Sequence, residues 1–102
     1  MNKAAIASEL HARLTWGAAQ AGVASGVMDA VASGAVAPGD VDDLLLIAAV
    51  WVDPAARDPQ AVYRNNREAT RAALDAGRRR LPALADVLAA RARPGNPFFG
   101  PA

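Results

Sequence analysis

Residues 44–52 read LLLIAAVWV, and this stretch decides the fold that the sequence predicts. Its nine apolar residues carry no charge and lie between Asp42-Asp43 and Asp53-Pro54. An apolar run of this length, bounded by turn-forming residues, is typical of a strand buried on both faces. Pro54 lacks a backbone N–H, so the strand should end before it. Because a buried strand must pair its backbone donors and acceptors, it needs a neighbouring strand from this chain or from another.

Length and composition narrow the class of protein. The chain has 102 residues, enough for one small domain over residues 1–102, and 53% of them are hydrophobic, many of them alanine. The absence of cysteine excludes disulfides and thiolate metal sites. A net charge of +1 does not favour nucleic acid as a partner. No signal peptide or membrane-spanning segment stands out, so we expect a cytoplasmic protein.

The residues before the apolar stretch predict one long helix. Apolar residues recur at three- and four-residue spacing over residues 9–33, with Ser8 as the N-cap and Gly34 as the residue that ends the helix. Gly22 and Gly26 share one face of this helix. Two glycines on one face let another backbone approach closely, and we expect that face to pack on a sheet.

The second half of the chain predicts two further helices. Asp58-Pro59 is a strong start signal for a helix that should end near Arg80. Residues 81–92 have the pattern of a second, shorter helix, and residues 93–102 should form an extended tail. With a weak strand at residues 3–7, the predicted order is β-α-β-α-α in a two-layer α/β fold, a small sheet covered by helices. Two strands alone do not form a stable sheet in water, so we expect oligomerisation.

Few side chains suit catalysis, and the sequence predicts no metal site. We expect His11, the only histidine, to be structural or on the surface. Asp42-Asp43 favours a turn over a carboxylate pair, and Arg78-Arg79-Arg80 favours a solvated helix end over an RNA contact. The two tryptophans, Trp16 and Trp51, should belong to the core or to an interface.

Five segments, taken in order, resemble the formaldehyde-activating enzyme family. Residues 2–6 look like the family's Asn-Lys-Val-Thr-Ile strand, and residues 17–20 like its Gly-Pro-Ala-Gln. The later segments are Asp42-Asp43-Leu44, the pair Val62-Tyr63 with Asn66 and Ala69-Thr70, and Asn96-Pro97-Phe98, which resembles a terminal His-Pro-Phe.

The resemblance implies a function. Members of the family condense formaldehyde with tetrahydromethanopterin, a co-substrate, to give the methylene adduct. Lys3 and Gln20 match pterin-contacting positions of the family. The resemblance further implies a mixed sheet with a left-handed crossover, assembled as a homo-oligomer in a ring of five. Independently of the resemblance, the apolar pair Phe98-Phe99 in the Pro- and Gly-rich tail favours docking on a neighbouring subunit.

The same resemblance identifies what these residues lack. The chain is expected to correspond to the C-terminal two thirds of the family, without the N-terminal part that holds the general-acid histidine. We therefore assign no catalytic residue, and His11 lies outside the family's catalytic motif. Three interpretations stay open: a homologue that binds the pterin and retains residual activity, a non-catalytic pterin- or formaldehyde-binding or assembly module that could join a full-length relative, and a fragment.

Overall fold

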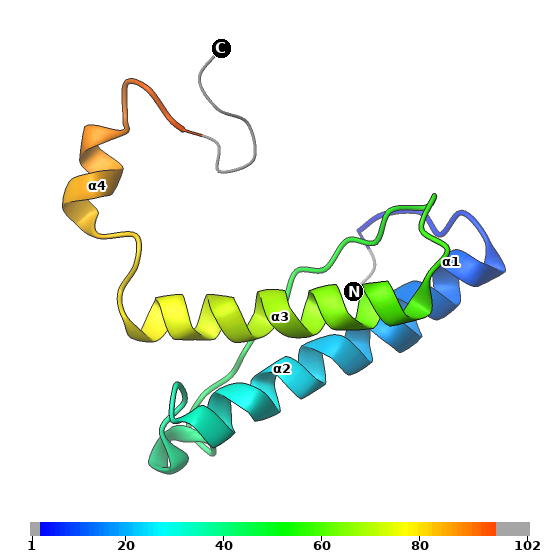
Figure 1. Cartoon of the computed structure of the whole chain (residues 1–102), viewed down its shortest axis with the longest axis horizontal. Helices are drawn as coiled ribbons and strands as arrows, with labels where there is room; N and C mark the ends of the chain where they lie inside the picture. Colours follow the sequence, from blue (N-terminus) through cyan, green and yellow to red (C-terminus); the bar gives the residue numbers. More distant parts are fainter. Residues whose placement is uncertain (1–2, 96–102) are drawn as a thin grey trace.

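The computed structural model describes residues 3–95, and within this range the chain forms helices and no strand. Figure 1 shows two long helices side by side, with a short helix standing apart from them. In chain order the elements are α1 (Glu9–Arg13), a π-helical turn (Leu14–Ala19), α2 (Gln20–Ser33), a 3-10 turn (Pro38–Asp40), α3 (Pro59–Arg78) and α4 (Leu84–Ala89). No helix of the described residues is both long and apolar enough to cross a bilayer.

The first long helix runs through α1, the π-helical turn and α2, so the prediction of a helix over residues 9–33 is confirmed. The Ser8 hydroxyl caps it by accepting the His11 backbone N–H at 3.0 Å. Gly34 ends it with a φ of 81°, a left-handed conformation that favours glycine. The π-helical turn in the middle was not predicted.

The predicted start of α3 is also confirmed, because the Asp58 carboxylate accepts the backbone N–H groups of Gln60 and Ala61. The third predicted helix, over residues 81–92, was too long, since α4 covers only Leu84–Ala89. Pro82 disfavours a helical conformation at the residue before it, which delays the start of α4. Residues 93–95 lie outside the helices, and Phe98-Phe99 and the rest of the predicted tail lie outside the described residues.

The helices α2 and α3 run in the same direction and are in close contact (Figure 1). Gly22 and Gly26 allow this close contact. A Cβ atom on Gly26 would lie 2.6 Å from the Arg67 carbonyl oxygen and 2.7 Å from the Thr70 Cβ. One on Gly22 would collide with the Tyr63 carbonyl oxygen. The close approach expected of these glycines is confirmed, but the neighbour is a helix and not a sheet.

The prediction of an α/β fold is wrong for the described part of the chain. Residues 44–52 are extended, yet residues 45–51 make no backbone–backbone hydrogen bond there, and residues 3–7 are not a strand either. A strand forms only when its backbone pairs with that of another strand, and residues 3–95 contain no partner strand for residues 44–52. A crossover connects two strands of one sheet, so the prediction of a left-handed crossover is also wrong for the described residues. The helices pack on each other instead.

The core is small and lies where the apolar stretch ends. Leu14 and Val52 are 1% and 5% exposed, and they pack with Ala19 and with residues of α1 and of the α3 start. Val52 is the one residue of the stretch 44–52 that is buried. By contrast, Leu45 and Ile47 are 84% and 89% exposed. The stretch therefore reaches the core at one end and leaves most of its apolar surface open.

Candidate functional site

A groove of about 630 Å³ lies along the first helix and is a candidate binding site. One wall is a face of the first helix, from His11 to Ala24. The other walls are two extended segments, residues 3–6 and residues 48–52. The volume falls in the range of small-molecule sites, and most of the lining is apolar. The stretch that was predicted as a strand thus serves as a groove wall.

Both residues singled out as pterin contacts line this groove. Lys3 belongs to the extended segment before α1, and Gln20 is the first residue of α2. Both are exposed. They lie 17 residues apart in the sequence and line the same groove, and their role in binding stays a prediction.

The two tryptophans also line the groove. Trp16 lies in the π-helical turn and Trp51 in the extended segment, and they are 52% and 68% exposed. The alternative that placed them in the core is therefore wrong for the chain as described, whereas an interface role stays a prediction. Two large apolar rings open to solvent in one groove offer flat surfaces on which a flat ligand can stack.

His11 is a buried residue of the helix wall of the groove and has a structural role. Its Nδ1 accepts the Ala7 N–H at 3.0 Å, and its Nε2 lies 2.7 Å from the Val52 carbonyl oxygen. Both ring nitrogens are thus engaged, which leaves none for a ligand or a metal ion. Among residues 3–95 no group of three or more His, Cys, Asp or Glu side chains could hold a metal ion.

Thr15 is a groove residue that the sequence reasoning missed. Its hydroxyl oxygen is buried and has no hydrogen-bond partner among residues 3–95. Such unsatisfied polar atoms are uncommon in proteins, and each needs an explanation. The available signal was weak: a threonine four residues after His11, on the same side of a helix.

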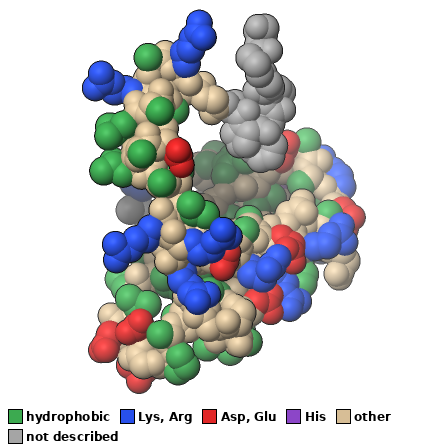
Figure 2. Space-filling model, turned by 60° about the vertical axis from the view of Figure 1, so that its left-hand side comes forward, with side chains coloured by type: hydrophobic (Ala, Val, Ile, Leu, Met, Phe, Trp, Pro, Cys, Tyr) green, Lys and Arg blue, Asp and Glu red, His purple; other side chains and the backbone are tan. Residues whose placement is uncertain are grey.

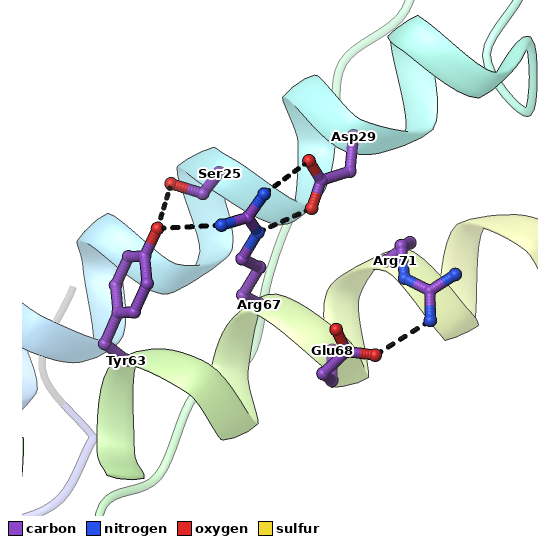
Figure 3. A network of polar contacts seen from close by, with 6 residues as sticks. All are labelled: Ser25, Asp29, Tyr63, Arg67, Glu68 and Arg71. Atoms are coloured by element: carbon purple, nitrogen blue, oxygen red, sulfur yellow. Dashed lines mark hydrogen bonds and ion pairs between the residues drawn. The ribbon is translucent and has the colours of Figure 1, made fainter. Parts of the chain in front are cut away.

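A second polar cluster joins α2 to α3 (Figure 3). Arg67 donates to both carboxylate oxygens of Asp29, at 2.6 and 2.8 Å, and to the Tyr63 hydroxyl at 3.3 Å. The Tyr63 hydroxyl in turn donates to Ser25 at 3.0 Å. The Arg67 hydrogen bond holds the pKa of the Asp29 carboxyl below its usual range, and Asp29 raises the pKa of Arg67. This cluster sets the register of the two helices.

Charged side chains of both signs lie close together on the surface of residues 3–95. Figure 2 shows basic and acidic side chains interspersed across the visible side of the molecule. Arg79 pairs with Asp75 at 3.5 Å, and Arg71 with Glu68 at 2.8 Å. The triplet Arg78-Arg79-Arg80 lies at and just after the end of α3, exposed, which agrees with a solvated helix end.

Comparisons with known proteins agree on one family. The family model described as formaldehyde-activating enzyme (Fae) matches residues 1–99. The 5,6,7,8-tetrahydromethanopterin hydro-lyase of Methanosarcina barkeri is 36% identical over 98 residues, which cover 96% of this chain and 55% of that protein. The bifunctional enzyme Fae/Hps of Methanothrix thermoacetophila is 32% identical over 98 residues, 96% of this chain and 25% of that protein. The chain thus spans about half or less of the length of these relatives, and no solved structure matches it.

Proposed function

Because the chain belongs to the formaldehyde-activating enzyme family, we propose that it binds tetrahydromethanopterin in the groove and promotes its condensation with formaldehyde. In this reaction the aldehyde carbon bonds to two nitrogens of the reduced pterin as a methylene group, its bonds to oxygen break, and the oxygen leaves as water with the two N–H hydrogens. The name of the Methanosarcina barkeri relative, a tetrahydromethanopterin hydro-lyase, supports this substrate.

The observation that carries the proposal is the meeting of Lys3 and Gln20 in one groove. The family resemblance alone marks both positions. The Gln20 amide both donates and accepts hydrogen bonds, which suits the amide-like edge of a pterin. The Lys3 ammonium supplies three donors for oxygen atoms of the ligand. A bound ring would lie between these two groups and beside the indoles.

The expected rate enhancement comes from orientation. Holding the pterin amine in a fixed position beside a small aldehyde lowers the entropic cost of the encounter. His11 is not available as the general acid, since both of its ring nitrogens are engaged within the protein. General acid catalysis typically contributes about 10²–10⁴-fold, so we expect these 102 residues to accelerate the reaction less than a protein that has such an acid.

The test is to mix the purified protein with formaldehyde and tetrahydromethanopterin and to follow formation of the methylene adduct. The expected result is a rate above the protein-free control that falls in Lys3→Ala and in Gln20→Ala. Gln60→Ala is the matched control, because Gln60 is an exposed glutamine of α3 outside the groove. A rate equal to the protein-free control contradicts catalysis. Binding without acceleration favours the non-catalytic interpretation.

A second candidate function is assembly, and the exposed stretch favours it. Leu45 and Ile47 are almost fully exposed, and the backbone around them is unpaired in the described structure. We propose that residues 44–52 pair with a strand of another chain, in a homo-oligomer such as a ring of five or in a complex with a full-length relative. Size-exclusion chromatography with light scattering tests this, and a stable monomer contradicts self-assembly.

Two further expectations stay predictions: that the chain matches the C-terminal part of its relatives, and that it is cytoplasmic.

A further inference from the structure

The π-helical turn shapes one wall of the groove. It spans Leu14–Ala19 and lies between α1 and α2, where the helix faces the two extended segments. A π turn holds one more residue than an α turn and is frequent at functional sites. Here it places both Thr15 and Trp16, which are neighbours in the sequence, along the same groove.

The Thr15 hydroxyl indicates a hydrogen-bond partner that the described residues do not supply. It is buried without a hydrogen bond, although its side chain lines the groove. Threonine in a helix divides between two rotamers, and we infer that ligand binding selects the one that turns the hydroxyl toward the groove. A hydroxyl that neither the described residues nor bulk solvent satisfies is well suited to a group of a bound ligand.

The two tryptophans indicate that this ligand contains a flat ring. Trp16 comes from the helix wall and Trp51 from the extended wall. Trp16 and Trp51 are 52% and 68% exposed, so about half or more of each side chain is open, and both line the groove. Aromatic faces stack on flat rings in offset or edge-on arrangements. A planar heterocycle with ring nitrogen or oxygen atoms can therefore use the indole faces and the hydroxyl together.

We propose that Thr15, Trp16 and Trp51 form the subsite that recognises the flat ring of the ligand, in which the indoles stack on the ring and the Thr15 hydroxyl hydrogen-bonds one of its edge atoms. The identification of that ring as a reduced pterin rests on the proposed function. His11 is a positioning residue for this subsite, because its bond to Val52 fixes the residue next to Trp51.

The decisive variant is Thr15→Val, which removes the hydroxyl and keeps the shape of the side chain. Two probes are titrated by anaerobic calorimetry: tetrahydromethanopterin, and a tetrahydropterin without the long side chain. The expected result is about tenfold weaker binding of both probes, the loss of one hydrogen bond. The midpoint of thermal unfolding should stay the same or rise, since an orphan hydroxyl has been removed. Thr15→Ser restores the hydroxyl and should restore binding.

The indoles are tested separately. Since Trp16 and Trp51 are the only tryptophans, quenching of the intrinsic fluorescence reports directly on the groove. Trp16→Leu and Trp51→Leu should each weaken binding of the side-chain-free probe about three- to tenfold by calorimetry. Gln60→Ala, outside the groove, should bind both probes like the wild type.

The outcomes separate the two proposals. A wild type that binds neither probe overturns the pterin assignment and the subsite with it. A wild type that binds both probes, with Thr15→Val and both leucine variants unchanged, overturns only the ring subsite. A Thr15→Val loss confined to the full ligand overturns the assignment of the hydroxyl to the ring, because the contact would then be with the side chain.

Discussion

His11 and Val52 are joined by a hydrogen bond of 2.7 Å that ties the first helix to the end of the apolar stretch. The Ala7 N–H donates to the other ring nitrogen, so the ring proton lies on Nε2 and the Val52 carbonyl accepts it. One buried side chain thereby fastens both extended segments, residues 3–7 and residues 44–52, to the helix. The walls of the groove depend on it.

Replacing this side chain should loosen both walls. In His11→Phe the aromatic bulk stays but both hydrogen bonds are lost, and the Val52 carbonyl is left buried without its donor. We expect the free energy of unfolding to fall by about 1–3 kcal/mol, measured by chemical denaturation. Pterin affinity should fall as well, since Trp51 follows the movement of Val52. His11→Gln, which retains an amide donor, should lose less. A His11→Phe protein as stable as the wild type would show that the bond adds nothing.

The ion pair between the long helices predicts a pH dependence of stability. The Arg67 hydrogen bond lowers the folded-state pKa of Asp29 below the value of about 3.9 in an unfolded chain. The unfolded state therefore takes up the proton first, and the contribution of Asp29 is present above about pH 4 and is lost as the pH falls through the folded pKa. Asp29→Asn should be less stable than the wild type at pH 7, and the difference should shrink below pH 4 in denaturation curves.

A matched control for this titration is Asp42→Asn. Asp42 is an exposed aspartate in the turn after the 3-10 turn. Its replacement should leave the free energy of unfolding at pH 7 unchanged, because Asp42 makes no ion pair among residues 3–95. If Asp29→Asn and Asp42→Asn follow the same curve, the Arg67 pair does not contribute to the acid sensitivity of the fold.

The two interface glycines predict a strong effect of a single methyl group. In Gly26→Ala the new Cβ would meet the Arg67 carbonyl oxygen, which is backbone and cannot move without separating the helices. We expect a loss of about 1–3 kcal/mol in the free energy of unfolding. In Gly77→Ala, also within a helix, nothing lies within 4 Å of the added atom, and this variant should gain up to about 1 kcal/mol. Equal effects at both positions would contradict the close packing of α2 on α3.

Local sequence signals predicted the helices correctly, but they could not predict whether a sheet forms among the described residues. Ser8, Gly34 and the pair Asp58-Pro59 act within a few residues of themselves, so their effect is visible in the sequence. A strand is different, because the pattern of residues 44–52 describes only one partner of a pair. The sequence cannot show that the second partner is absent from the described structure.

Some residues of the candidate site could be predicted from the sequence, and others could be found only from the structure. Lys3 and Gln20 could be found from the sequence because a family resemblance marks positions without needing the fold. Thr15 could not, since an unpartnered hydroxyl is defined by the atoms around it. The π-helical turn was hidden for the same reason: its residues, LTWGAA, have no composition that separates a π turn from an α turn.

The exposed end of the apolar stretch provides the last prediction. Leu45 and Ile47 are nearly fully exposed, so the double variant Leu45→Asp/Ile47→Lys should change the free energy of unfolding of the monomer by no more than about 0.5 kcal/mol. If the stretch pairs with another chain, the same variant should shift the mass measured by light scattering toward the monomer. Leu14→Ala is the contrasting core variant, because Leu14 is buried and its truncation should cost about 2–5 kcal/mol. A double variant that assembles like the wild type would exclude residues 44–47 from the interface.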